Sequence, residues 1–142
     1  MRIYDCFTFY NEFELLELRL ESLWDVVDRF VIVESNKTFT NKPKEYNFIA
    51  RQNDYRKYFP KIRYVVENDR VPYNGTGDWS IEINQRNAIM RGIQDAQPDD
   101  LIFISDLDEI PAPDVVSRIR NNEAVIVFPY WHPLNGGRGL SA

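Results

Sequence analysis

The stretch RIYDCFTFYNEFELLELRLESLWDVVDRFVIVES, residues 2–35, sets the topology because its hydrophobic pattern changes twice. Residues 2–10 and 29–35 are rich in β-branched and aromatic side chains, which is typical of strands. The second run is almost continuously apolar, as expected for a strand that is buried on both faces. Between the two runs, apolar side chains recur at helical intervals: Phe13, Leu16, Leu20, Leu23 and Val27. A strand, a helix and a strand in this order predict a βαβ unit with a parallel pair of strands.

The same alternation continues through the rest of the chain. Residues 62–67 and 100–105 are apolar runs predicted as strands, and residues 78–97 between them have the apolar spacing of a helix. Residues 112–122 predict a short helix with a proline at its start, and residues 124–131 predict a last strand. Polar segments with proline or glycine are predicted as loops: residues 36–48 and 70–80. This pattern predicts an α/β fold, an open and mostly parallel sheet with helices on both faces in a Rossmann-like arrangement.

Composition and charge limit the classes of function. The 142 residues are 44% hydrophobic and 27% charged, which is typical of a single globular domain. With 17 basic and 22 acidic residues the net charge is −5, so we expect no nucleic acid among the partners. Cys6 is the only cysteine, which excludes an intramolecular disulfide, and we expect a buried thiol. The sequence has no signal-peptide core and no apolar run of membrane-spanning length, so a cytoplasmic protein is expected.

Polar side chains follow three of the predicted strands where they end: Asn11 and Glu12, residues 34–37, and residues 105–109. In an open parallel sheet, ligands bind beyond the carboxyl ends of the strands. Because these ends meet at one edge of the sheet, we predict that these residues form a single ligand-binding rim. Asn11 also has a side chain that suits the N-cap of the following helix.

The acidic part of this rim lies in DDLIFISDLDEIPAPD, residues 99–114, where Asp106 and Asp108 flank Leu107. If the strand geometry continues, both carboxylates point one way and Leu107 points into the core. Two carboxylates this close repel each other unless a cation lies between them, and oxygen ligands without histidine or cysteine favour Mg²⁺ or Mn²⁺. Such an ion would use its open positions to bind a diphosphate. In the alternative interpretation, the acidic side chains cap the following turn and helix.

Other charged or titratable side chains remain as candidates. Arg86 lies in the first half of the helix predicted before the acidic strand, where its guanidinium either binds a phosphate or pairs with Asp106. Glu34, at the end of its strand, either accepts hydrogen bonds from a base or ribose or caps the next loop. His132 is the only histidine, and no serine lies in a nucleophile-elbow setting, so a Ser-His-Asp triad is not supported.

Residues 3–44 together with ISDLDEIP, residues 104–111, resemble glycosyltransferase family 17, and the resemblance runs in order from Arg2 to Pro113. This is the family of the β-1,4-mannosyl-glycoprotein 4-β-N-acetylglucosaminyltransferases, which add the bisecting GlcNAc to N-linked glycans. The resemblance implies a GT-A-like nucleotide-sugar fold, UDP-GlcNAc as donor, a glycan or glycoconjugate as acceptor, and inversion at the anomeric carbon. It therefore predicts a metal-dependent glycosyltransferase of glycan biosynthesis, with protein N-linked glycosylation as the family's process.

The resemblance also implies roles for single residues. Asp106 and Asp108 would be the DxD pair that holds Mn²⁺ or Mg²⁺, with Asp106 also near the nucleotide sugar. Residues 85–93, QRNAIMRGI, and the acidic strand are similar to the broader glycosyltransferase family 2, which places Arg86 near the diphosphate. By the same analogy, three residues of the rim would lie near the uridine: Asn11, Glu12 and Glu34.

Family members are usually longer, and the half of a GT-A domain that binds the acceptor follows the DxD strand. We therefore expect residues 1–142 to form a single GT-A-type domain that lacks part of its acceptor-binding half, including the general base. Glu123 and His132 are the only downstream groups that could serve as that base. The alternative is a truncated, non-catalytic module that binds a nucleotide sugar or a partner protein. A nucleotidyltransferase fits less well, because no glycine- and basic-rich loop follows the first strand.

Overall fold

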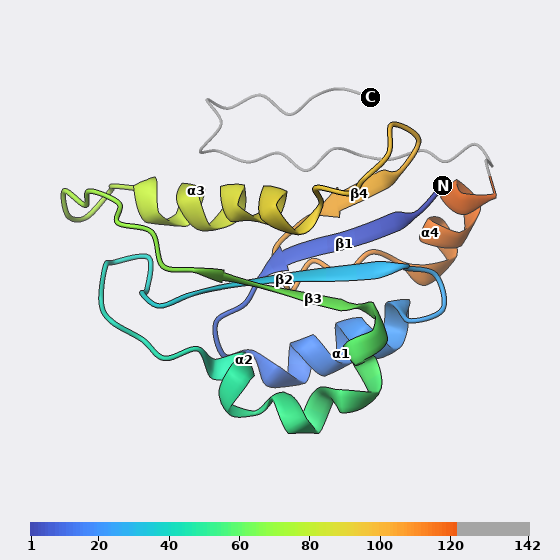
Figure 1. Cartoon of the computed structure of the whole chain (residues 1–142), viewed down its shortest axis with the longest axis horizontal. Coiled ribbons are helices and arrows are strands. Elements are labelled where there is room, and N and C mark those ends of the chain that lie inside the picture. Colours follow the sequence, from blue (N-terminus) through green and yellow to red (C-terminus); the bar gives the residue numbers. More distant parts are fainter. Residues whose placement is uncertain (122–142) are drawn as a thin grey trace.

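Four parallel strands form the centre of the computed structural model, which describes residues 1–121 (Figure 1). The strands are β1 (Ile3–Thr8), β2 (Arg29–Ser35), β3 (Ile62–Glu67) and β4 (Leu101–Ile104). They lie in the spatial order β3-β2-β1-β4, so that Cys6 of β1 pairs with Val31 on one side and Ile104 on the other. This all-parallel sheet confirms the predicted α/β fold, and the helix between β1 and β2 confirms the βαβ unit.

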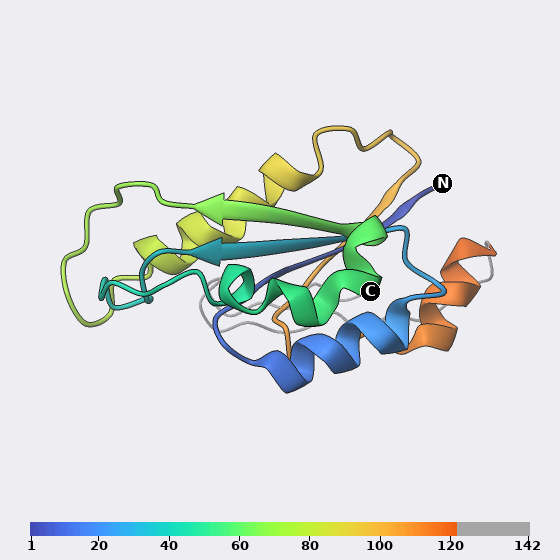
Figure 2. The same ribbon diagram turned by 60° about the horizontal axis from the view of Figure 1, so that its bottom comes forward.

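Helices cover both faces of the sheet (Figure 1, Figure 2). One face carries α1 (Phe13–Leu23), α2 (Asn47–Ala50), the 3-10 helix η1 (Gln52–Lys61) and α4 (Pro113–Arg120). The other carries α3 (Ser80–Asn87) and the 3-10 helix η2 (Ala88–Gly92). Side chains alternate along β1, so Ile3 and Phe7 belong to the core under α1, whereas Tyr4 and Cys6 belong to the core under η2.

The core under η2 is closely packed. A Cβ atom at Gly92 would lie 2.3 Å from Cγ1 of Val31, so only glycine lets the end of η2 approach the sheet this closely. Cys6 is fully buried in the same core, which confirms the expected buried thiol, and burial raises its pKa to about 12. Its thiol is therefore a packing group at neutral pH.

The helical elements differ from the sequence predictions in two places. The predicted helix 78–97 is shorter, since α3 gives way to η2, which ends at Gly92 against β2. The predicted loop 36–48 already contains the start of α2, and η1 follows it. These two short helices form because Phe48, Tyr55 and Tyr58 pack into the core under α1, a tertiary contact that no local pattern reveals.

The prediction of Asn11 as N-cap is also wrong. Helix α1 starts at Phe13 with Glu12 as its N-cap, and the carboxylate of Glu12 accepts hydrogen bonds from the backbone nitrogens of Tyr10 (3.2 Å) and Asn11 (3.3 Å). The helix predicted with a proline at its start is confirmed as α4. The strand predicted at residues 124–131 lies outside the described residues. Every helix within residues 1–121 is too short or too polar to cross a membrane.

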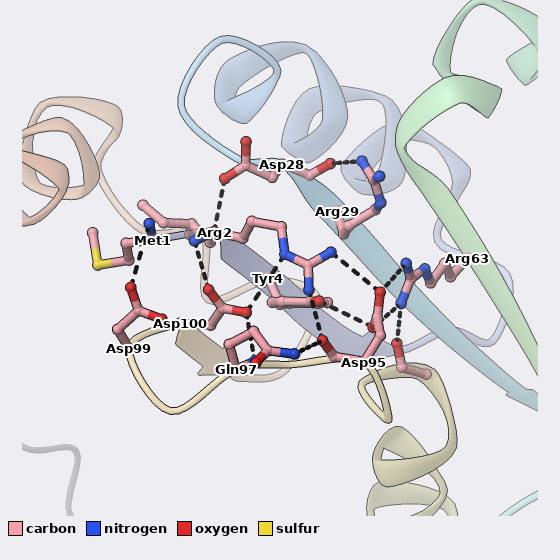
Figure 3. A network of polar contacts seen from close by, with 12 residues as sticks. Met1, Arg2, Tyr4, Asp28, Arg29, Arg63, Asp95, Gln97, Asp99 and Asp100 are labelled. Atoms are coloured by element: carbon pink, nitrogen blue, oxygen red, sulfur yellow. Dashed lines mark hydrogen bonds and ion pairs between the residues drawn. The ribbon is translucent and has the colours of Figure 1, made fainter.

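A network of ion pairs joins the amino ends of the strands (Figure 3). Asp95, in the segment before β4, accepts hydrogen bonds from Nη1 (2.5 Å) and Nη2 (2.7 Å) of Arg63 and from the hydroxyl of Tyr4 (3.0 Å). Arg2 lies 3.2 Å from Asp95 and 3.5 Å from Asp100. These five residues, called the amino-end network below, connect β1, β3 and the entry to β4 at the end of the sheet opposite the rim.

Candidate functional site

A hollow of about 490 Å³ lies at the carboxyl ends of β1, β2 and β4. Its walls come from the loops after β1 and β2, from α3 and from the turn after β4. The charged, amide and exposed aromatic side chains that line it are Tyr10, Glu12, Lys37, Phe39, Lys44, Glu82, Gln85, Asp106 and Asp108. The structure therefore brings Glu12, Asp106 and Asp108 of the predicted rim to one place. The other candidates lie beside this hollow and do not line it: Asn11, Glu34 and Arg86.

The acidic turn, residues 105–109, follows β4 directly. β4 ends at Ile104, so the expectation that strand geometry continues through Asp108 is wrong. A hydrogen bond from the backbone nitrogen of Glu109 to the carbonyl oxygen of Asp106 (3.0 Å) closes a turn instead. The turn nevertheless buries Leu107 in the core under α1 and leaves Asp106 and Asp108 exposed at the hollow, which is the division that was predicted.

Three carboxylates of the acidic turn lie at a spacing that fits a metal ion. Asp106, Asp108 and Glu109 each offer an oxygen within 4.8 Å of the other two. All three are hard oxygen donors, and within residues 1–121 no histidine or cysteine belongs to the cluster, which is the donor set of Mg²⁺ or Mn²⁺. Glu109 also accepts a hydrogen bond from the backbone nitrogen of Asp106 (3.0 Å), so this side chain caps the turn as well. The chemistry of the turn thus fits the ion predicted from the sequence.

Arg86 pairs with the acidic turn from the side of α3. Its Nη2 lies 2.7 Å from Oδ1 of Asp106 and 3.7 Å from the carboxylate of Glu82. The side chain of Arg86 is 39% exposed, so the pair with Asp106 is accessible to solvent and to a ligand. The ion pair with Asp106, one of the two interpretations from the sequence, is present in the structure. It places a guanidinium next to the carboxylates that would hold the metal.

Glu34 has the contacts of a structural group. Its carboxylate is fully buried at the end of β2. It accepts hydrogen bonds from the segment that starts α2 and from its surroundings: Lys44 Nζ (2.8 Å), Asn47 N (2.6 Å), Phe48 N (2.9 Å) and the Tyr64 hydroxyl (2.7 Å). Burial, together with the carboxylate of Glu34, raises the pKa of Tyr64, which stays a neutral donor. Glu34 thus holds the loop beside the hollow, the capping role that was its alternative interpretation.

The two lysines that line the hollow already have partners inside the protein. Lys37 donates from Nζ to Glu67 (2.9 Å) and to the carbonyl oxygen of Asp69 (2.7 Å). Lys44 donates to Glu34, and its Nζ lies 5.4 Å from the centre of the Tyr10 ring. Their ammonium groups therefore hold the loop after β2 in place, and within residues 1–121 Arg86 is the exposed cation that pairs with the acidic turn.

Two aromatic rings of the hollow were not singled out from the sequence. Tyr10 and Phe39 line it and are 43% and 45% exposed. Both rings are therefore open to a ligand that enters the hollow. The available signal was a phenylalanine isolated in the polar loop 36–44 and a tyrosine directly after the first strand. The two downstream candidates for a general base, Glu123 and His132, lie outside the described residues.

Fold and site together define a class of protein. An open parallel sheet with a hollow and a carboxylate cluster beyond its carboxyl ends is the arrangement of a GT-A-like α/β fold. The sequence profile of glycosyltransferase family 17 matches residues 1–127, and the chain belongs to this family. This confirms the resemblance found in the sequence.

Named relatives support the same assignment. The chain is 33% identical over 122 residues to the beta-1,4-mannosyl-glycoprotein 4-beta-N-acetylglucosaminyltransferase of Rattus norvegicus, a match that covers 81% of this chain and 22% of the rat protein. The protein of the same name from Homo sapiens is also 33% identical over 122 residues, with 81% and 23% covered. The chain thus matches less than a quarter of the length of these relatives. No solved structure matches the chain significantly.

Proposed function

We propose that this chain binds the donor in a metal-dependent, inverting glycosyltransferase that transfers N-acetylglucosamine from a UDP-sugar to a glycan. The observation that carries the proposal is the carboxylate cluster of Asp106, Asp108 and Glu109 at the edge of the 490 Å³ hollow. In a member of glycosyltransferase family 17, such a cluster would hold the metal ion that binds the diphosphate of a nucleotide sugar. The sugar and the type of acceptor are taken from the name of the rat and human relatives.

The carboxylates of the acidic turn would hold Mn²⁺ or Mg²⁺, which when bound supplies Lewis-acid stabilisation of the departing diphosphate. The protein's own groups then divide the work of binding the donor. Arg86 can exchange part of its contact with Asp106 for a phosphate oxygen, since guanidinium binds both groups with the same donors. Tyr10 and Phe39 offer exposed rings against which a uracil base can stack.

The remaining candidates act on the shape of the hollow. Glu12 lines it at the start of α1, where its carboxylate can accept a hydrogen bond from the ribose or base. Glu34 acts one step away, because it fixes Lys44 and the start of α2 behind the loop that carries Phe39. Asn11 is exposed next to Tyr10, in the connection between β1 and α1. The donor would thus lie across the carboxyl ends of β1, β2 and β4.

Calorimetry of UDP binding in the presence of Mn²⁺ tests the proposal. The wild-type chain is expected to bind, and Asp108→Asn is expected to abolish Mn²⁺-dependent binding because it removes one charged ligand from the cluster. Asp99→Asn is a matched control, since Asp99 is also exposed and lies before β4, at the opposite end of the strand. Unchanged UDP binding by Asp108→Asn would contradict the metal assignment.

Incubation of the purified chain with UDP-GlcNAc and Mn²⁺ separates a transferase from a module that only binds the nucleotide sugar. Release of UDP, with or without an added glycan acceptor, supports turnover by this chain. Binding of the donor without release supports the non-catalytic module, the alternative left open by the sequence.

A further inference from the structure

Arg19 lies in the middle of α1 with its side chain fully buried. It sits within the apolar stripe formed by Leu16, Leu20 and Leu23, which faces the sheet. A buried charge is seldom the most stable choice for such a position, because a hydrophobic side chain of similar volume is often as good or better. The guanidinium therefore needs a reason other than packing, and its hydrogen bonds supply one.

One edge of the guanidinium is anchored on β1. Nε and Nη2 of Arg19 lie 2.7 Å and 2.6 Å from the two carboxylate oxygens of Asp5, which is also fully buried. This forked pair defines the plane of the guanidinium. The ring of Phe7 lies against one face, 4.6 Å from the guanidinium carbon. Arg19 is thus held rigidly between helix and sheet.

The remaining N–H donors of Arg19 are directed at the acidic turn from the side of the core under α1. Nη1 donates to the carbonyl oxygens of Asp106 (2.7 Å) and Leu107 (3.1 Å), with a longer contact of 3.4 Å to that of Glu109. Nη2 donates to the hydroxyl of Ser105 (2.7 Å), which in turn donates to the carbonyl oxygen of Glu109 (3.1 Å). All five N–H groups of the guanidinium are therefore used: two on Asp5, one on the hydroxyl of Ser105, and the two of Nη1 on the backbone of the turn.

These contacts fix the direction of the side chains in the turn. Because the carbonyl oxygens are held inward by Arg19, the carboxylates of Asp106 and Asp108 are left at the hollow while Leu107 is buried. Three carboxylates within 4.8 Å repel each other and would widen an unsupported turn. Arg19 opposes this by bonding the backbone at two consecutive carbonyls.

We infer that Arg19 is a positioning residue of the donor site, which keeps the acidic turn at the spacing that binds a divalent cation. This inference rests on the proposed function, since it assigns a support to the proposed metal site. Arg19 is fully buried, and it acts through the backbone carbonyls of the turn and the hydroxyl of Ser105.

Two variants and a control test it by Mn²⁺ titration calorimetry, at a temperature where circular dichroism shows each protein folded. Arg19→Lys keeps the charge but loses the fork, and it is expected to weaken Mn²⁺ binding at least about tenfold, as loss of a support behind a metal ligand does. Ser105→Ala removes only the hydroxyl relay and is expected to weaken it less. The control Leu23→Ala empties a buried site one turn further along α1 that offers no hydrogen bond to the turn, and it is expected to leave Mn²⁺ affinity unchanged.

Amide hydrogen exchange of the metal-free proteins provides an independent measurement. Exchange at residues 106–109 is expected to accelerate selectively in Arg19→Lys and Ser105→Ala, and not in Leu23→Ala. If Arg19→Lys does not fold, Ser105→Ala decides by the same two measurements. If Arg19→Lys and Ser105→Ala lose no more Mn²⁺ affinity than Leu23→Ala does, the inference is overturned. If the wild type itself does not bind Mn²⁺, the proposed metal site is refuted, and amide hydrogen exchange alone tests the positioning role of Arg19. Selectively faster exchange at residues 106–109 in the two variants then supports that role, and unchanged exchange overturns it.

Discussion

Acidic side chains gather at both ends of the sheet, and at the two ends they meet different partners. In the amino-end network, Asp95 is bound by both Arg63 and Arg2, and Asp100 by Arg2 (Figure 3). In the acidic turn, Asp106 shares a single guanidinium with Glu82, and Asp108 has no cationic partner among residues 1–121. One end of the sheet therefore balances its charge internally, and the other leaves negative charge at the edge of a hollow.

The pKa values within the amino-end network reflect its internal pairing. Hydrogen bonds from Arg63 hold the pKa of Asp95 well below its ordinary value of 3.8, against a smaller opposing effect of desolvation. The pKa of Arg63 is raised in return, chiefly by its hydrogen bond to Asp95. A pair that satisfies itself in this way supports the fold and has little left to offer a ligand. Unpaired carboxylates in a cluster, in contrast, gain most from a cation supplied from outside.

Position at the carboxyl end of the sheet is not sufficient to make a carboxylate part of the site. Glu34 and Glu67 end neighbouring strands on that same edge, and both are fully buried with hydrogen-bonded partners. Lys37 and Lys44 neutralise them within the protein. The carboxylates of the candidate site therefore differ from the structural carboxylates in being exposed and in having fewer cationic partners among residues 1–121. The predictions below test that distinction.

Glu34→Ala is expected to have the largest effect on stability, a loss of about 3–5 kcal/mol in the free energy of unfolding. The variant leaves Lys44 buried without its counter-charge and removes the acceptor of the backbone nitrogens that start α2. Urea unfolding followed by tryptophan fluorescence measures it. Glu45→Ala, at an exposed glutamate in the same segment, is the control and should change little. A similar, small loss in both variants would refute the structural role of Glu34.

Mn²⁺ should stabilise the wild type but not Asp108→Asn. At a concentration one hundred times the dissociation constant, a bound ion adds about 2.7 kcal/mol to the free energy of unfolding. Without metal, Asp108→Asn should differ from the wild type by no more than about 0.5 kcal/mol, because the side chain is exposed and forms no ion pair with residues 1–121. Thermal unfolding with and without Mn²⁺ measures both effects. A clear loss of stability in metal-free Asp108→Asn would instead show that Asp108 has a structural role, like Glu34 and Glu67.

Asp95→Asn is expected to have the smallest effect, since the amino-end network is partly exposed and screened by salt. The pKa of Asp95 is lowered in the folded state, so its ionised form stabilises the protein fully above the unfolded value of 3.8. That contribution is lost as the pH falls further towards the folded pKa. The variant should therefore be less stable than the wild type at neutral pH, with the gap closing below about pH 4. Urea midpoints across this pH range measure it, and a gap independent of pH would contradict the prediction.

The parts of the fold that could be predicted from the sequence are those with a repeating local pattern. The continuous apolar runs of β2 and β4 and the helical spacing in α1 each follow from burial of one kind of surface. The placing of Leu107 in the core and of Asp106 and Asp108 outside it was likewise readable from their alternation. α2 and η1 were not readable, because α2 is only four residues long, η1 is polar with Pro60 inside it, and their helical turns depend on Glu34 and on buried aromatic rings.

The sequence by itself determined a parallel α/β sheet with acidic residues beyond the end of one strand, since strand and helix periodicity depend only on which side chains avoid water. The tertiary structure alone decided which charged side chains are paired inside the protein and which remain available to a ligand. Arg19 meets the acidic turn and Arg63 meets Asp95 across long intervals of chain, and Lys44 meets Glu34 through the loop after β2. Each of these pairings depends on distance and burial in three dimensions, and the same residue types in the sequence are compatible with either role.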